Sequence, residues 1–251
     1  DAPCGSVAAA AREVHLKKYA YRRTTRAVAH YHHPMAKRST NGASAVSPAG
    51  PDAIGDSKAA QTRSRILDAA AHVLSVKGYA GLRLTDVAEK AELQAPAIYY
   101  YYRSRDDLIE EVMWVGIADM RQHVTAVLDA LPPEATPMER LLAAVEAHLR
   151  HALEISDYTT ASIRNAGQVP LTIRKRQIRE EEQYGEVWRR LINDLARAGE
   201  LRDDLDLYVA QMLVLGALNW AVEWWDPRRG SLVSIVANAQ TFARHGLAPA
   251  P

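Results

Sequence analysis

Apolar positions in this chain recur at steps of three and four residues, the spacing that places side chains on one face of an α-helix. No stretch alternates apolar and polar residues at period two, as a half-buried strand would. The pattern predicts nine helices, over residues 59–77, 84–91, 95–101, 106–131, 136–155, 158–165, 173–199, 203–225 and 231–244. We therefore expect an all-α fold with about nine helices.

The helices predicted over 84–91 and 95–101 are separated by only three residues, Glu92 to Gln94. Helices joined by so short a turn cross steeply, which is the helix-turn-helix arrangement that places the second helix in a DNA major groove. The second helix starts with mostly small or apolar side chains, which permit a close approach to DNA: Gln94, Ala95, Pro96 and Ala97. Pro96 suits the first turn, where a missing N–H costs nothing.

Short motifs surround this turn at fixed spacing: Gly78-Tyr79, Asp86-Val87-Ala88, Ile98-Tyr99, Tyr102, Ser104-Arg105 and Asp106 to Leu108. On these motifs, from about Thr62 to Leu108, the chain resembles the DNA-binding domain of the tetracycline-repressor (TetR) family of bacterial regulators. Two positions depart from the family pattern. Glu92 replaces the usual turn glycine, which predicts either a turn without a left-handed residue or a strained turn. Arg83 replaces a common capping threonine and offers a phosphate contact instead.

The DNA contacts that we expect combine the start of the second helix with residues that the resemblance implies. Consecutive helical residues point about 100° apart, so the four tyrosines from Tyr99 to Tyr102 cannot share one environment. The resemblance implies that Tyr102 is buried, that Tyr99 meets a phosphate and that Arg105 clamps one. Arg63 is either a phosphate contact or part of a solvated basic turn. The expected DNA-binding residues are Arg63, Arg83, Thr85, Gln94, Ala95, Pro96, Ala97, Tyr99, Tyr100, Tyr101 and Arg105.

The helix predicted over 203–225 is apolar almost all round from Met212 to Ala221. A helix of that kind must be buried on several sides, which in a chain of this size implies a partner. The resemblance implies a homodimer joined by a four-helix bundle of the last two helices of each subunit. Two recognition helices would then lie roughly 34–36 Å apart on a palindromic operator. It also implies that a small molecule in the body shifts the helix over 106–131, a lever, and lowers DNA affinity.

The segment from Tyr184 to Leu232 resembles a subgroup of the family that regulates the breakdown of lipids or sterol-derived acids and responds to acyl-CoA thioesters. Apolar side chains of the body are candidates for an effector cavity, with arginine at its mouth for phosphate or carboxylate. The expected ligand-binding residues are Met113, Met120, Leu149, Arg164, Trp188, Trp220 and Trp224. The alternative for the tryptophans and methionines is packing in the core or in the dimer seam.

Charge is distributed unevenly, although the formal net charge is only +1. Residues 1–57 and residues 58–105 each carry 8 Lys and Arg against 4 Asp and Glu, whereas residues 106–251 carry 15 against 22. This division predicts a disordered basic, low-complexity tail (1–57), a DNA-binding domain (58–105) and an effector-binding and dimerisation domain (106–251). The tail holds a histidine cluster (His30, His32 and His33) without metal-site spacing, and Met35 is a candidate natural start.

Other functions have little support in the sequence. No glycine-rich phosphate loop, nucleophile elbow or metal-spaced Cys/His set is present, so we expect neither an enzyme nor a cofactor or metal. The single Cys4 fits a reducing cytoplasm, and no run of about 18 uncharged apolar residues predicts a membrane span. We expect a cytoplasmic, ligand-responsive DNA-binding regulator, a repressor that binds a palindromic operator as a dimer. The alternative is a helical protein-interaction module whose DNA-binding head no longer functions.

Overall fold

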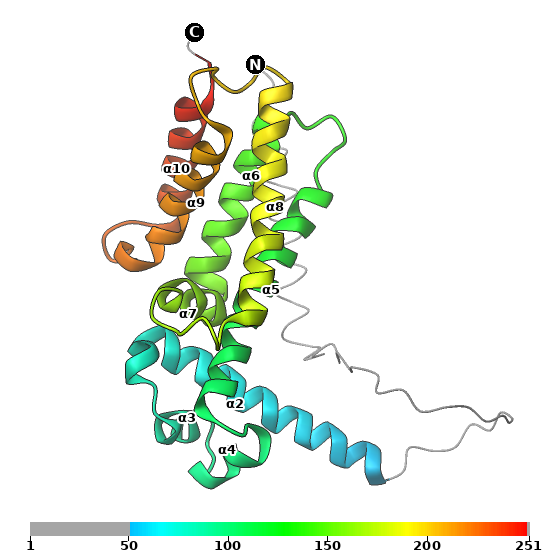
Figure 1. Ribbon diagram of the computed structural model, residues 1–251, viewed down its shortest axis with the longest axis vertical. Coiled ribbons are helices and arrows are strands. Elements are labelled where there is room, and N and C mark those ends of the chain that lie inside the picture. The colour runs from blue at the N-terminus through cyan, green and yellow to red at the C-terminus, as the bar shows by residue number, and fades with distance from the viewer. Residues whose placement is uncertain (1–50, 250–251) are drawn as a thin grey trace, which may run out of the picture.

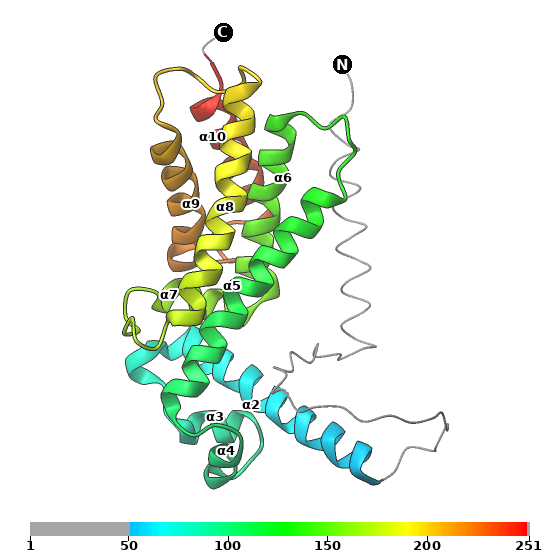
Figure 2. The same cartoon turned by 45° about the vertical axis from the view of Figure 1, so that its right-hand side comes forward.

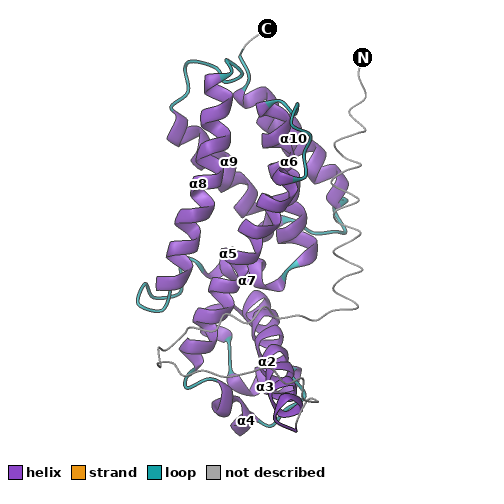
Figure 3. Cartoon of the chain, turned by 90° about the vertical axis from the view of Figure 1, so that its right-hand side faces the viewer, coloured by secondary structure: helices purple, strands orange, loops and turns teal. Residues whose placement is uncertain are grey.

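The computed structural model describes residues 51–249, with side chains from Lys58 onward. The described residues form α-helices joined by loops, without a strand, so the predicted all-α class is confirmed (Figure 3). The helices are α2 (Pro51–Gly81), α3 (Leu84–Lys90), α4 (Ala95–Tyr101), α5 (Arg105–Asp129), α6 (Pro137–Arg150), the short π-helix η1 (His151–Ile155), α7 (Asp157–Asn165), α8 (Lys175–Arg197), α9 (Leu207–Trp224) and α10 (Leu232–Leu247). The expectations for the histidine cluster and for Met35 lie outside the described residues.

The helices form a small head and an elongated body (Figure 1). Helices α2, α3 and α4 make the head, and α5 rises out of it into the body beside α6 and α8. Helices α9 and α10 cover one side of the body, and α7 lies across the junction between the two parts (Figure 2). None of the described helices combines the length and apolar character needed to cross a membrane.

The head has its own hydrophobic core, which extends along α5 to α7. Ile66 and Leu74 of α2, Val87 of α3 and Ile98 of α4 are completely buried together. Tyr102 is buried as well, as the resemblance implied. Because buried side chains of α2, α3 and α4 share this core, the helix-turn-helix pair is held against one rigid support.

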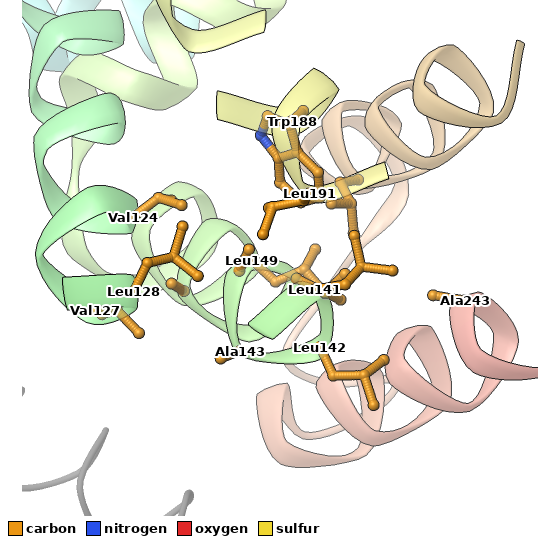
Figure 4. Packing of buried hydrophobic residues seen from close by; sticks show 14 of the residues in the cluster. Val124, Val127, Leu128, Leu141, Leu142, Ala143, Leu149, Trp188, Leu191 and Ala243 are labelled. Carbon is orange, nitrogen blue, oxygen red and sulfur yellow. The ribbon is translucent and has the colours of Figure 1, made fainter. Parts of the chain in front are cut away.

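The core of the body lies between α5, α6, α8, α9 and α10. Trp188 of α8 is fully buried and lies near Leu191 and the α6 side chains Leu141 and Leu149 (Figure 4). Leu128 of α5 closes this core from the lever side. Burial of a leucine side chain such as that of Leu128 contributes about 1.5–3 kcal/mol to the free energy of folding.

Helix ends follow local capping chemistry. Thr136 and Glu139 form a capping box at the start of α6, and the Ser104 hydroxyl accepts a 3.0 Å hydrogen bond from the Asp107 N–H at the start of α5. The predicted helix start at residue 203 is wrong. Asp206 caps α9 instead, because the carboxylate of Asp204 is held in the preceding loop by the Arg202 guanidinium at 2.5 and 2.7 Å.

Candidate functional site

The turn between α3 and α4 is strained at Glu92. This residue has φ = 55°, in the left-handed region that favours glycine, so the second alternative for the departure at this position is confirmed. The Leu93 N–H donates to the Ala88 carbonyl across the turn at 2.9 Å. Arg65 of α2 donates to the carbonyl groups of Ala91 and Glu92, so one guanidinium stabilises the end of α3 and the strained residue.

Helix α4 presents an exposed surface while its buried residues hold it in place. Tyr100 is 85% exposed and Tyr99 60% exposed, whereas Ile98 and the following Tyr102 point into the core of the head. At the other end, Gln94 is the N-cap residue and its amide makes no capping hydrogen bond. The side chains that could reach a DNA groove therefore lie at the two ends of α4. Four of the predicted residues are exposed there: Gln94, Pro96, Tyr99 and Tyr100. The other three are half-buried: Ala95, Ala97 and Tyr101.

Two of the arginines predicted to contact DNA, Arg63 and Arg105, are paired within the head. Arg63 pairs with Glu111 of α5 and lies 5.1 Å from the centre of the Tyr102 ring, and burial raises the pKa of that tyrosine. Arg105 donates to the carbonyls of Tyr79 and Leu82 and stacks on the Tyr79 ring at 4.5 Å. Both guanidinium groups thus join α2 to α5 within the head.

Arg83 and Thr85 are exposed at the start of α3. Arg83 is the N-cap residue of this helix and makes no side-chain capping bond, so its guanidinium is directed to solvent. The two residues lie close together beside the helix-turn-helix, where a DNA backbone would pass. The DNA contacts at all these positions stay predictions.

A cavity of about 410 Å³ lies between α6, α9 and α10. Its wall is almost entirely apolar and is formed by Val145, Leu149, Val214, Ala217, Leu218, Ala221, Trp224, Ile235, Asn238, Ala239, Phe242 and Ala243. Phe242 is 74% exposed and Trp224 54% exposed, so the cavity reaches the outer surface of α9 and α10. A volume and lining of this kind suit a small apolar ligand.

The structure brings together only two of the residues predicted to bind a ligand. Leu149 and Trp224 line the cavity. Met113, Met120 and Trp188 are buried in the cores, the environment that the alternative interpretation describes. Trp220 is 65% exposed on α9.

Arg164 is engaged within the protein. Its guanidinium donates to the backbone carbonyls of Ser75 in α2, at 2.9 Å, and Val222 in α9, at 2.5 Å. The Glu223 carboxylate lies 3.5 Å from its Nε. This arginine therefore connects three helices at the junction of head and body.

A buried polar cluster was not anticipated from the sequence. His148 Nδ1 lies 2.9 Å from the Tyr184 hydroxyl, and the rings of Tyr184 and Trp188 meet edge to face with their centres 6.2 Å apart. Burial lowers the pKa of His148 from 6.5 to about 3, while a hydrogen bond with Asn219 opposes the shift. The signal in the sequence was the appearance of His148 and Tyr184 within otherwise apolar stripes.

An apolar surface covers the outer side of the last two helices. The large apolar side chains exposed there are Leu207, Tyr208, Val209, Met212, Leu213, Trp220, Trp224, Val233 and Phe242. Helix α9 is thus buried on one side only within the described part of the chain. Exposed apolar side chains of this size, gathered on two neighbouring helices, indicate an interaction site.

Comparison with known proteins identifies both parts of the chain. Residues 66–112 match the family model described as "Bacterial regulatory proteins, tetR family", and residues 134–243 match "Tetracyclin repressor-like, C-terminal domain". The chain is 21% identical over 168 residues to the fatty acid metabolism regulator protein of Bacillus subtilis (strain 168), covering 64% of this chain and 81% of that protein. It is 23% identical over 169 residues to the HTH-type transcriptional repressor KstR2 of Mycobacterium tuberculosis (strain ATCC 25618 / H37Rv), covering 66% and 82%.

A solved structure has the same fold. AibR in complex with isovaleryl coenzyme A and operator DNA superposes with a TM-score of 0.65 at 18% identity, covering 72% of this chain and 97% of that chain. This likeness spans the head and the body together.

Proposed function

Because this chain belongs to the TetR family of bacterial regulatory proteins, we propose that it is a repressor that binds a palindromic operator as a homodimer and is released by an acyl-CoA thioester. Its relatives are transcriptional regulators rather than enzymes. A protein that regulates bacterial genes by binding DNA acts in the cytoplasm. The observation that carries the proposal is the pairing of an exposed recognition helix with a separate apolar cavity in one chain.

The DNA-binding part of the proposal rests on α4 and its surroundings. Gln94 supplies an amide for base edges, and small neighbours let the helix approach closely. We expect phosphate contacts from Arg83 and Thr85, which are exposed at the start of α3, and from Tyr99 and Tyr100, which are exposed at the end of α4. We assign Arg63 and Arg105 a second task, to keep α5 attached to the head, because their guanidinium groups pair within it.

The proposal that the protein is a homodimer rests on the exposed apolar side chains of α9 and α10. Nine large apolar side chains on two adjacent helices would be costly to leave in water. Two copies related by a two-fold axis would cover this surface on both subunits and place two heads on one face of the DNA.

The proposal that the effector is an acyl-CoA rests on the cavity and on the relatives of this chain. An apolar volume of about 410 Å³ accepts a hydrocarbon chain. A regulator of fatty acid metabolism is among the relatives, and the AibR structure contains isovaleryl coenzyme A. Leu149 and Trp224 are the predicted ligand-binding residues that we retain as cavity lining.

Selection of binding sites from random duplex DNA tests the first half of the proposal. A repressor of this kind should enrich a palindrome, with an affinity that falls steeply as salt increases because bound phosphates release counterions. A chain that enriches no sequence and ignores duplex DNA at low salt would be the alternative, an interaction module with a non-functional head.

Titration of the resulting protein–operator complex with butyryl-, octanoyl-, lauroyl- and palmitoyl-CoA tests the second half. At least one thioester should release the operator, and free coenzyme A at the same concentration is the control. Release by none of them would reject the acyl-CoA effector while leaving the DNA-binding function intact.

A further inference from the structure

Helix α7 is bound tightly to the lever helix α5. The two cross at Gly116, where an added Cβ would collide with the Ser162 hydroxyl and the Tyr158 carbonyl. The Thr159 hydroxyl donates to the Gly116 carbonyl at 2.9 Å, and the Ser162 hydroxyl donates to the Met113 carbonyl at 2.7 Å. A close crossing held by two buried hydrogen bonds moves as a unit.

Helix α7 is bound equally tightly to α2 of the head. The Asn165 amide donates to the Leu74 carbonyl at 3.3 Å, and its oxygen accepts from the Tyr79 N–H at 2.7 Å. The Tyr158 hydroxyl donates to Asp68 at 2.8 Å. A displacement of α7 must therefore reach the long helix that supports the helix-turn-helix.

The lever helix α5 does not touch the cavity. All lining residues come from α6, α9 and α10. A ligand in this cavity therefore has no direct contact through which to push α5, and its effect on the head needs another route. Helix α9 also approaches the junction between head and body. Ala221 and Trp224 of this helix line the cavity, and Val222 and Glu223, which lie between them in sequence, contact Arg164 at the junction.

Arg164 provides that route. One nitrogen of its planar guanidinium fork binds the Ser75 carbonyl of α2, and another binds the Val222 carbonyl of α9. The fork is rigid, so the two carbonyls cannot shift independently while both bonds persist. Glu223 adds an ion pair on the α9 side.

We propose that Arg164 is a positioning residue that couples the cavity to the DNA-binding head, by carrying displacements of the α9 segment 221–224 to α2. The inference rests on the proposed function for its biological meaning, and it replaces the predicted role of Arg164 as a ligand contact. A ligand in the cavity displaces the end of α9, and Arg164 transmits this displacement to Ser75 of α2. Because α7 is bound to both α2 and α5, α5 moves together with the head.

Operator binding with and without the acyl-CoA that releases the wild-type protein tests the coupling. Allosteric ligands typically change affinity about 5- to 150-fold, and the same factor must appear when the effector affinity is measured with and without operator. In Arg164→Met, the factor by which effector changes operator affinity and the factor by which operator changes effector affinity should both fall toward about one. The affinity for operator without effector, and for acyl-CoA without operator, should stay as in the wild type. Arg164→Lys, which cannot span both carbonyls, should keep only part of the factor.

The matched control is Arg150→Met, which removes a half-buried arginine that pairs within α6, with Glu146 at 2.7 Å. It should retain the wild-type factor in both directions. A folded Arg164→Met protein with the wild-type factor would overturn the inference. A wild-type protein that binds no operator, or that no thioester releases, would instead reject the proposed function.

A second measurement needs neither DNA nor effector. Ala217→Phe and Ala239→Phe fill the cavity from α9 and α10, and amide hydrogen exchange then reports the protection of residues 72–79 in α2. We expect a filled cavity to change this protection in the presence of Arg164 and to leave it unchanged in Arg164→Met. A change of equal size in both backgrounds, or no change in either, would contradict the coupling.

Discussion

The side-chain oxygen of Asn165 accepts a 2.7 Å hydrogen bond from the backbone N–H of Tyr79, 86 residues earlier in the chain. This N–H is available because Gly78, at φ = 70°, interrupts the helical backbone of α2. A residue in α7 thus completes the hydrogen bonding of a helix in the head, and its buried amide is one of the bonds that attach the head to the body.

Replacement of this amide should loosen the junction. Asn165→Leu keeps the side-chain size but leaves the Tyr79 N–H without its side-chain partner, which costs about 1–3 kcal/mol. Urea denaturation measures the loss of stability. The exposed Gln168→Leu should change stability by less than about 0.5 kcal/mol. A stable Asn165→Leu protein would show that the junction does not depend on this amide.

A methyl group at Gly116 should separate α7 from α5. The added Cβ meets the Ser162 hydroxyl and the backbone of Tyr158, so Gly116→Ala forces the helices apart and is expected to cost about 1–3 kcal/mol or more. The midpoint of thermal unfolding measures it. Gly246 in α10 faces open space, and Gly246→Ala should instead stabilise by about 0.5–1 kcal/mol. Equal effects of the two substitutions would exclude a close crossing at Gly116.

Glycine at position 92 should stabilise the head. Glu92 pays about 1–2 kcal/mol for its left-handed backbone, and its side chain is 89% exposed and pairs only at 3.6 Å with Arg65. Glu92→Gly should therefore raise the free energy of unfolding by about 1 kcal/mol. Glu89→Gly, at an exposed helical position, should lower it by about the same amount. A loss of stability in Glu92→Gly would mean that its side chain matters more than its backbone.

Acidification should destabilise the body through His148. Its pKa is lowered to about 3 in the folded protein, mainly by burial, from 6.5 in the unfolded chain. The unfolded state therefore binds the proton first, and stability is lost as pH falls below about 6.5. At about pH 5 the loss amounts to about 2 kcal/mol relative to pH 7.5, since one pKa unit is about 1.4 kcal/mol.

Denaturation of wild type and His148→Gln at both pH values measures this contribution. The variant should lack about 2 kcal/mol of the pH dependence. The half-exposed His72→Gln serves as the control and should retain it. If wild type and His148→Gln lose equal stability on acidification, His148 is not the group that titrates.

A charge on the outer side of α9 should prevent dimerisation. Leu213 is 65% exposed within the apolar surface of α9 and α10, and burial of a carboxylate at this position in an interface would cost several kcal/mol unless it found a partner. Leu213→Glu should run as a monomer in sedimentation and bind a full palindrome no more tightly than a half-site. Val76→Glu, an equally exposed apolar position in α2, should leave both properties unchanged. A dimeric Leu213→Glu protein would place the interface elsewhere.

Much of the head was predictable because its signals are local. The short turn from Glu92 to Gln94 follows from apolar spacing within a few turns of helix, whereas the burial of Tyr102 was implied by the resemblance to the family. The apolar circumference of α9 likewise showed that one chain cannot bury it.

Only the tertiary structure assigned the arginines and tryptophans of the body. Apolar periodicity identifies the face of a helix that is buried but not the helix that covers it, so Trp188 in a core and Trp224 at a cavity look alike in sequence. Arg164 is the clearest case, since its partners Ser75 and Val222 are 89 and 58 residues away. Backbone carbonyls carry no sequence signal, and contacts with them are decided by how the helices pack.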